Sequence, residues 1–496
     1  MLDNNEKKLG YFKIDESIVY KMSPDMAYKF YIFPFKISEN KVHIISVNEL
    51  DNTVETYIKF IYKKDIVKLY IWDKQDVYVI LSKYYKKKLI DNAMEQFNKE
   101  DKENLYFTVQ ENNKNVDEAP AVKIVSFLID QGINMNASDI HIEPYEKMVL
   151  IRFRIDGILN KYLQLPNSIY NSLSARIKIM ANMDISKKFI PLDGKISYTL
   201  GKDKYDLRIS TLPTLYGEKI VIRILYKNYE NVYIEELGFS DSDYKNIKKL
   251  ICSKGGMILV TGPTGSGKTT TLYSLLNAMD KSKNNIMTIE DPVEYNMCYI
   301  NQVNVNNKSG LTFAYGLRSL LRQDPDIILI GEIRDNETAE IAIKAALTGH
   351  LVLSTLHTKD AASAVTRLMD MKIENYLLAD TLLGVVSQRL VRKICNNCKE
   401  SVLPLEEEKR KLNLNEGEVI YRGRGCNKCN GTGYFSRTVI CEVMEINDYR
   451  RETIRKTNIY NREKNLKENM KLLKQSAIEL VKEGITTYEE VLKYIV

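Results

Sequence analysis

The chain has 496 residues, with 72 Lys or Arg against 65 Asp or Glu, and its net charge is +7. A charge this small on a chain of this length, spread over lysine-rich surface runs, argues against a dedicated nucleic-acid-binding surface. No stretch approaches the roughly 18 consecutive apolar residues of a membrane-spanning helix, and the first residues lack the apolar core of a signal peptide, so we expect a cytoplasmic protein that can dock on a membrane complex.

The first hundred residues show no pattern of catalytic side chains. Residues 1–97 alternate short apolar runs with charged turns, which predicts a small α+β module. Residues 98–119 are rich in Lys, Glu, Asp and Asn and predict a linker. At about 100–200 residues per domain, the whole chain is long enough for three or four domains.

Residues 120–226 predict a second α+β domain. A helical pattern begins at Pro120, and several strand-like runs follow it. Two of these runs contain a single arginine each, Arg208 and Arg223. An arginine in a strand of this kind needs an anionic partner, which is either a ligand or a local carboxylate such as Asp206 or Glu218.

The stretch Gly262-Pro-Thr-Gly-Ser-Gly-Lys-Thr269 carries the clearest chemistry. An apolar run, 257–260, precedes it as a strand, and 270–279 continues as a helix, which is the context of a phosphate-binding loop. Backbone N–H groups and the helix N-terminus would hold the phosphates, Lys268 would meet the β- and γ-phosphates, and Thr269 would bind Mg²⁺. The predicted ATP contacts are Gly262, Pro263, Thr264, Gly265, Ser266, Gly267, Lys268, Thr269 and Thr270.

Two further strands end in carboxylates. The run 285–289 leads into a segment that ends at Glu294, and the run 327–330 leads directly to Gly331-Glu332. Ligands of doubly wound sheets lie at the carboxyl ends of the strands. An acidic strand end after a phosphate loop is typical of the group that holds Mg²⁺ or its water.

A third strand-like run, 351–356, is bracketed by histidines. His350 precedes the run and His357 follows it, and the chain has only four histidines in all. This placement favours a functional role for the pair over simple packing.

Two C-x-x-C pairs lie in residues 391–441. Cys395 and Cys398 form the first pair, and Cys426 and Cys429 form the second. Four thiolates allow a closed tetrahedral Zn²⁺ site, which is structural because it leaves no position open to water. The gap between the pairs is long, so four reduced thiols without a metal remain the alternative.

These patterns divide the chain into six regions. They are an N-terminal α+β module (1–97), a linker (98–119), a second α+β domain (120–226), a nucleotide-binding core (227–390), a tetracysteine region (391–441) and a helical C-terminal region (442–496).

Taken together, the motifs resemble the type II secretion and type IV pilus assembly ATPases. The family's Walker A, aspartate box, Walker B and histidine box occur in order, and the resemblance covers residues 120–496. The stretches that carry it are 262–273, 289–294, 317–335 and 348–358, with 137–144 and 153–157 upstream and 425–434 downstream.

The resemblance implies an α/β fold, in which a RecA-like P-loop NTPase core with a zinc-knuckle insertion follows a PAS-like α+β domain and a small N-terminal α+β domain. It implies a homohexamer that uses ATP and Mg²⁺, associates peripherally with the inner membrane through a platform protein, and acts indirectly on pilin subunits. The cysteine insertion and the extra N-terminal module are similar to the assembly or extension type. We favour a pilus over a secretion pseudopilus.

The resemblance also assigns residue roles. It makes Glu294 the general base and leaves Glu332 to Mg²⁺ through water, whereas generic phosphate-loop logic gives the base role to Glu332. Arg208 and Arg223 match arginines that close onto the γ-phosphate. The other residues assigned to the site are Arg318 and Arg322, four apart on one helical face, and His350 and His357 as phosphate sensors or interface residues.

One motif departs from the family. Where the family has Pro-Gln-Asp-Gly-Arg, this chain has Pro191-Leu-Asp-Gly-Lys195, so polar roles at those two changed positions are not expected. The alternative function is a nucleic-acid-translocating or conjugation-type motor, which shares the loop and predicts salt-dependent stimulation by nucleic acid. A non-hydrolysing scaffold is a third alternative, and the intact Glu294 and Glu332 argue against it.

Overall fold

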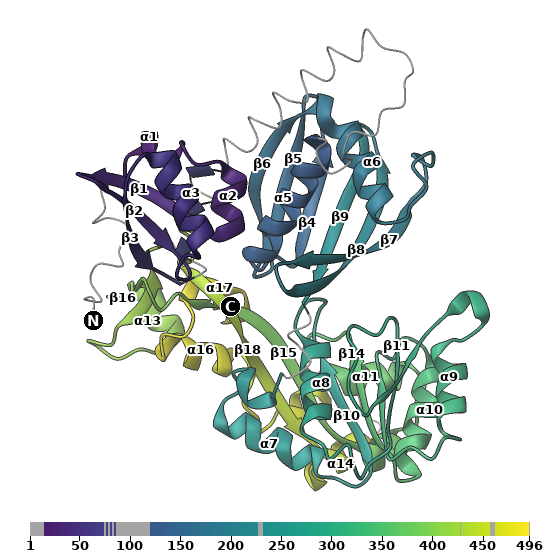
Figure 1. Ribbon diagram of the computed structural model, residues 1–496. Coiled ribbons are helices and arrows are strands. Elements are labelled where there is room, and N and C mark those ends of the chain that lie inside the picture. Colours follow the sequence, from purple (N-terminus) through teal and green to yellow (C-terminus); the bar gives the residue numbers. More distant parts are fainter. Residues whose placement is uncertain are drawn as a thin grey trace. The chain divides into compact units, whose positions relative to one another are not determined.

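The computed structural model describes residues 14–73, 76–77, 80–81, 84–85, 120–226, 232–426, 428–456 and 462–495 (Figure 1). The predicted linker lies outside these residues. The chain divides into two compact units, Met1–Leu225 with Gly425–Thr432, and Tyr226–Arg424 with Gly433–Val496. Among the described residues, no helix is both long enough and apolar enough to cross a membrane.

A three-stranded sheet forms the N-terminal part of the first unit. Its first two strands make an antiparallel hairpin, and the second and third are parallel, with a helix as the crossover. His43, on the middle strand, contacts Ser38 Oγ (2.6 Å) and Tyr70 OH (3.1 Å), as expected for a structural residue. The elements are α1 (Glu16–Val19), α2 (Pro24–Phe30), β1 (Ile32–Ser38), β2 (Lys41–Ser46), α3 (Asn52–Tyr62) and β3 (Ile66–Ile71).

Residues 120–225 of the first unit form a six-stranded antiparallel sheet of order β6-β5-β4-β9-β8-β7, together with helices α5 and α6. Helix α5 begins at Pro120 as predicted. It approaches the sheet closely at Gly132, where a Cβ would lie 2.7 Å from Ile140 Cδ1. The elements are α5 (Pro120–Asn134), β4 (Asp139–Pro144), β5 (Met148–Ile155), β6 (Ile158–Pro166), α6 (Tyr170–Met180), β7 (Leu192–Leu200), β8 (Asp203–Thr214) and β9 (Gly217–Leu225).

A set of ion pairs covers one face of this sheet. Because side chains alternate along a strand, the charged residues of β4 share a face. Asp139 on β4 accepts from Arg223 Nε at 3.0 Å. The local partner that Arg223 uses is therefore Asp139, and not Glu218, which instead contacts Lys178 Nζ at 2.7 Å. The sequence could not show this pairing because it depends on which strands are neighbours.

A seven-stranded sheet forms the centre of the second unit, in the order β12-β11-β13-β14-β10-β15-β18. All neighbours are parallel except β15 and β18. The central strands are fully buried, which explains their continuous apolar sequences. The strands are β10 (Gly256–Thr261), β11 (Ile286–Glu290), β12 (Asn301–Asn304), β13 (Ile327–Ile330), β14 (Leu351–Leu356), β15 (Leu382–Ile394) and β18 (Tyr434–Glu445).

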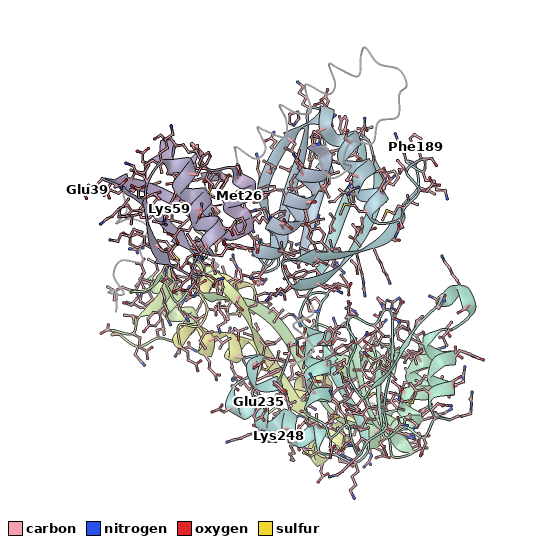
Figure 2. The ribbon with its side chains drawn as sticks, in the orientation of Figure 1. Met26, Glu39, Lys59, Phe189, Glu235 and Lys248 are labelled. Carbon is pink, nitrogen blue, oxygen red and sulfur yellow. The ribbon has the colours of Figure 1, made fainter. Side chains whose placement is uncertain are left out.

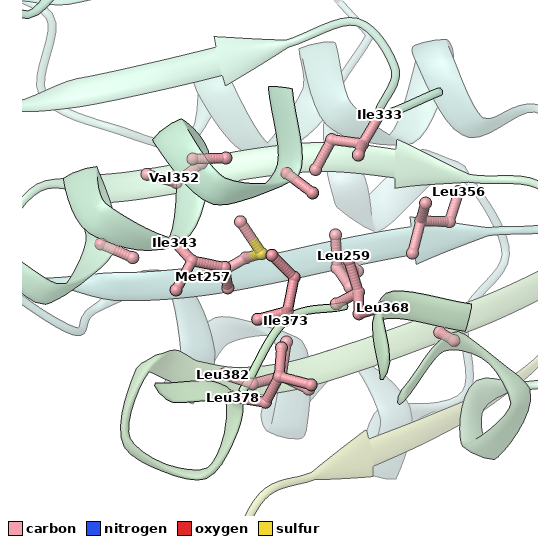
Figure 3. Packing of buried hydrophobic residues seen from close by; sticks show 14 of the residues in the cluster. Met257, Leu259, Ile333, Ile343, Val352, Leu356, Leu368, Ile373, Leu378 and Leu382 are labelled. Atoms are coloured by element: carbon pink, nitrogen blue, oxygen red, sulfur yellow. The ribbon is translucent and has the colours of Figure 1, made fainter. Parts of the chain in front are cut away.

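Helices cover both faces of this sheet, so the architecture is α/β with a doubly wound, mainly parallel sheet. Alternate residues of β10 face opposite sides of the sheet. Met257 and Leu259 join one core (Figure 3), and Ile258 and Val260 join the other. On the Met257 face lie α9 (Phe313–Leu320), α10 (Asn336–Leu347), α11 (Ala361–Asp370), α12 (Asn375–Thr381), α14 (Asp448–Arg455) and α15 (Arg462–Leu466), and on the other lie η5 (Ile234–Glu236), α7 (Asp241–Ile251) and α8 (Lys268–Asn277).

A third core joins the cysteine region to the C-terminal helices. Val391 on β15 and Ile440 on β18 are buried in one cluster with Val481 and Val491. The two long strands therefore belong both to the central sheet and to this outer part. The elements added here are β16 (Lys399–Val402), α13 (Glu406–Leu412), β17 (Ile420–Gly423), α16 (Leu473–Lys482) and α17 (Tyr488–Ile495).

Candidate nucleotide site

The phosphate-binding loop joins β10 to α8. The backbone φ angles of the loop glycines are 148° at Gly262, 79° at Gly265 and 86° at Gly267. Residues other than glycine rarely adopt such values. Gly267 is the N-cap of α8, and no side chain caps the helix there. The first N–H groups of α8 are therefore available to an anion, together with the positive end of the helix dipole.

Lys268 is the first residue of α8, and its side chain folds back over the loop. Its Nζ donates to the carbonyl oxygens of Gly262 (2.9 Å) and Pro263 (3.0 Å). Burial lowers the pKa of Lys268 to about 8, although the charge of Glu332 opposes this shift. An ammonium group in such surroundings gains more from a phosphate than from carbonyl oxygens. Thr269, which follows Lys268 in α8, is exposed to solvent.

Glu332 lies two residues beyond the end of β13 and faces the loop lysine. Its carboxylate binds Arg334, and its Oε2 lies 3.7 Å from His357 Nε2, just beyond the end of β14. Burial and the nearby charge of Lys268 lower the pKa of His357, although the charge of Glu332 opposes this shift. The structure thus brings Lys268, Glu332 and His357 together, as the strand ends predicted. Arg334 was not singled out from the sequence.

Glu290 ends β11 and anchors the segment that carries Glu294. It is buried, and it accepts hydrogen bonds from Tyr273 OH on α8 and from Thr288 Oγ1 (2.6 Å). Burial raises the pKa of Glu290, and the nearby charge of Glu294 adds to this shift. Glu294 itself is half-buried. The connection from α8 through Tyr273 was not visible in the sequence, because a Tyr in a helix gives no signal of its partner.

The two arginines expected on one helical face lie at the end of α9. Arg318 lies on α9 and contacts Glu337 at 2.7 Å. Arg322 lies beyond the end of α9 at Leu320, and its guanidinium donates to the Arg318 carbonyl at 2.9 Å. The helix ends before Arg322, but the turn that follows keeps its guanidinium against the last turn of α9, and the expected roles of both arginines stay predictions.

Arg208 and Arg223 lie in the other compact unit. They are register partners on the neighbouring strands β8 and β9. Arg223 keeps its ion pair with Asp139, whereas its side chain is 61% exposed, so a second anion could still reach it. The two guanidinium groups are thus displayed as a pair on one sheet.

His350 does not share the surroundings of His357. It precedes β14, at the edge of the sheet opposite to the loop, and its Nδ1 lies 3.0 Å from the Ala345 carbonyl oxygen and 3.1 Å from Thr348 Oγ1. A strand the length of β14 spans roughly 20 Å. The expected phosphate-sensor role of His350 is therefore wrong for the loop of its own chain, and the histidine instead closes the turn after α10.

The four cysteines form a cluster. Their sulfur atoms all lie within 4.8 Å of one another, and Cys426 Sγ is 3.7 Å from Cys429 Sγ. Four sulfurs at about 2.3 Å from a tetrahedral Zn²⁺ lie roughly 3.8 Å apart, so the set fits this metal. Cys395 also donates its N–H to the carbonyl oxygen of Gly433, four residues after Cys429, at 2.9 Å.

The comparison with protein families decides what the site belongs to. The family described as Type II/IV secretion system protein matches residues 114–493. The chain belongs to this family. It is 45% identical over 383 residues to the type II secretion system protein E of Dickeya dadantii. This alignment covers 76% of each of the two chains. It is 47% identical over 383 residues to the type IV pilus assembly ATPase PilB of Thermus thermophilus, which covers 76% of this chain and 43% of PilB.

Solved structures agree with this assignment. The crystal structure of the pilus retraction motor PilT with bound ADP is 27% identical with a TM-score of 0.50, and the match covers 74% of this chain and 95% of PilT. The ATPase DotB of Legionella pneumophila shares the fold, with a TM-score of 0.56 at 21% identity, over 78% of this chain and 97% of DotB. The family resemblance and the ATPase activity expected from the motifs are both confirmed.

Proposed function

We propose that this ATPase is the assembly motor of a type IV pilus or of a secretion pseudopilus. The observation that carries the proposal is that one sheet edge gathers the loop and Glu332 with His357, in a chain whose relatives are a type II secretion protein E and PilB. The tetracysteine cluster supports the assembly type. The finer fold we propose is a RecA-like core after a PAS-like domain.

The nucleotide and its Mg²⁺ fit the residues at this edge. Open N–H groups of α8 and the Lys268 ammonium would hold the β- and γ-phosphates, and Thr269 with Glu332 would hold the metal, directly or through water. Bound Mg²⁺ supplies neutralisation of the charge that develops on the phosphates. Glu294 would orient the attacking water and accept its proton, and His357 would sense the γ-phosphate.

Two substitutions test the assignment of the base. Glu294→Gln keeps the size of the side chain and removes the proton acceptor, so we expect ATP turnover to fall at least about 100-fold with ATP binding preserved. Glu332→Gln weakens the hold on Mg²⁺, so its defect should shrink as Mg²⁺ is raised. Full turnover in Glu294→Gln would overturn the assignment. Glu49→Gln, in the N-terminal module, is the control.

Arginines supply the remaining positive charge in this proposal. Arg208 and Arg223 would close onto the γ-phosphate, and Arg318 and Arg322 would act at the same nucleotide or at a subunit boundary. Contacts of this kind exist only while the γ-phosphate is present. Hydrolysis would therefore release them and let one compact unit move relative to the other.

We propose that the four cysteines hold one structural Zn²⁺. Their mutual distances fit a closed site, and three of the four are buried. Cys398→Ser should lower the bound zinc from one per chain to near zero and expose Tyr434 and its neighbours to proteolysis. Cys252→Ser, which changes a cysteine outside the cluster, should keep one zinc. A wild-type protein purified without any zinc would contradict the site.

The partners follow from the same proposal. We place a homohexamer at the cytoplasmic face of the inner membrane, docked on a platform protein and acting indirectly on pilins, because the relatives are named for secretion and pilus assembly. Sedimentation with Mg²⁺ and a non-hydrolysable ATP analogue should give six-fold mass. Turnover that nucleic acid stimulates, with a steep salt dependence, would favour the alternative motor instead.

A further inference from the structure

A buried glutamine on β15 faces the back of the phosphate-binding loop. Gln388 is 1% exposed and lies on the same face of the strand as Val386, which belongs to the apolar core around α8. A buried amide among apolar side chains is costly unless its polar atoms are satisfied. Both ends of this amide are satisfied, and both partners belong to the loop or to the helix that follows it.

The two hydrogen bonds of the Gln388 side chain reach the loop and the helix that follows it. Its Nε2 donates to the Ser266 carbonyl oxygen at 2.8 Å. Its Oε1 accepts from Thr271 Oγ1, one turn into α8, at 2.9 Å. The amide therefore links the last part of the loop to the first turn of the helix.

The loop glycines pack directly on this residue. A Cβ at Gly262 would lie 2.6 Å from the Gln388 carbonyl oxygen, and a Cβ at Gly267 would lie 3.2 Å from its Nε2. Arg389, the next residue, holds the backbone of β15 behind the loop. Its Nη1 donates to the Gln388 carbonyl oxygen at 2.8 Å, and its Nη2 donates to the Lys359 carbonyl oxygen. The shape of the loop is thus determined by strand β15 as well as by its own glycines.

We propose that Gln388 is a positioning residue for the nucleotide, which holds the loop in its phosphate-binding shape through Ser266 and Thr271. It does not touch the phosphates. It acts by keeping the backbone N–H groups aimed at them, since a loop that can relax binds the β-phosphate less tightly. This inference rests on the nucleotide site proposed above.

The variant Gln388→Glu should lose nucleotide affinity in a pH-dependent way, which a purely structural role of Gln388 does not predict. The carboxylate still accepts from Thr271, but it cannot donate to the Ser266 carbonyl oxygen and repels it. When protonated, the carboxyl group donates again, and burial favours that neutral form. We therefore expect Mg-ADP binding about tenfold weaker than that of the wild type at pH 8.5, and restored to within about twofold at pH 5.5, with wild type measured at each pH as the reference.

Two further variants keep the proposal testable if the charged variant does not fold. Gln388→Met removes both bonds at similar volume and should weaken Mg-ADP binding roughly tenfold at both pH values, and Thr271→Val removes one bond and should weaken it about threefold. Ser387→Ala is the matched control, because Ser387 is equally buried on the same strand and its Oγ has no hydrogen-bond partner in the described part of the chain.

Fluorescence titration with a labelled ADP separates the outcomes. Wild-type affinity in Gln388→Glu at pH 8.5, or an equal loss at both pH values, would overturn the role of Gln388. Wild-type affinity in Gln388→Met would do the same. A wild-type chain that binds no Mg-ADP at all would instead overturn the nucleotide site itself.

Discussion

At the scale of single residues, the second α+β domain contains an almost fully buried lysine. Lys178 Nζ contacts Glu218 Oε1 at 2.7 Å and donates to the Lys187 carbonyl oxygen at 2.9 Å. The ammonium has been removed from water, and the carboxylate supplies the opposite charge. Removing one partner from such a pair leaves an uncompensated buried charge, which costs far more than breaking a surface pair.

We expect Glu218→Gln to lower the free energy of unfolding by about 3 kcal/mol or more. The double variant Lys178→Met with Glu218→Gln should recover most of this loss, because it removes the orphaned charge. Urea denaturation, monitored by hydrogen exchange of the α6 amides, would measure the free energy of unfolding of the single and the double variant. Glu55→Gln breaks the exposed pair with Lys59 (Figure 2) and should cost below about 0.5 kcal/mol. A similar loss in Glu218→Gln and Glu55→Gln would contradict the argument.

At the scale of elements, helix α5 places a carboxylate against β7. Tyr198 OH on β7 donates to Asp130 Oδ1 at 2.6 Å, while burial raises the pKa of Asp130 to about 6. The folded pKa is above that of the unfolded chain, so the folded state binds more protons between about pH 4 and pH 6. The stability that Asp130 contributes is therefore greatest at low pH and is lost as the pH rises through about 6.

Asp130→Asn keeps an acceptor for Tyr198 and removes the buried charge. We expect it to raise the unfolding temperature of the full chain at pH 7.5 by several degrees, and to lose most of this advantage at pH 4.5. Asp203→Asn, at the exposed start of β8, should leave the pH dependence unchanged. An equal effect of Asp130→Asn at both pH values would show that the carboxylate is not the cause.

The elements themselves were the part of the fold that the sequence predicted best. The apolar runs at 257–260, 327–330 and 351–356 each became a strand of the central sheet, because continuous apolar sequence is what burial on both faces requires. The end of α9 before Arg322 and the contacts of Gln388 were not predicted. The end of α9 and the partners of β15 both depend on tertiary contacts, which local periodicity does not contain.

The same limit applies to the site. Lys268, Glu332 and His357 could be grouped from the sequence because each follows the end of a parallel strand, and such ends share one edge. His350 was grouped with His357 by their symmetry about one strand, although a strand separates its two ends by its own length. Only the direction of β14 distinguishes the two histidines.

At the scale of the whole molecule, the proposed motor divides its positive charges between two compact units. Arg223 lies two residues before the end of β9, and η5 of the ATPase unit begins at Ile234. The connection, residues 226–233, spans at most roughly 30 Å. A short connection raises the effective concentration of one unit at any site of the other that lies within its reach. We therefore expect Arg208 and Arg223 to serve the nucleotide bound by the same subunit.

Mixing two inactive variants tests this expectation. Lys268→Ala lacks a working loop, and Arg208→Ala lacks the arginine. If arginine and loop belong to the same subunit, no subunit of a mixed ring has both, and co-assembled variants should stay at the residual turnover of each variant alone. If the arginine served a neighbour, about a quarter of the subunits in a one-to-one ring would regain a complete site, and turnover would rise accordingly. Mixing Lys268→Ala with the wild type is the control that shows whether subunits exchange. With exchange shown, a recovery of turnover in the mixture of Lys268→Ala and Arg208→Ala would overturn the assignment to one subunit.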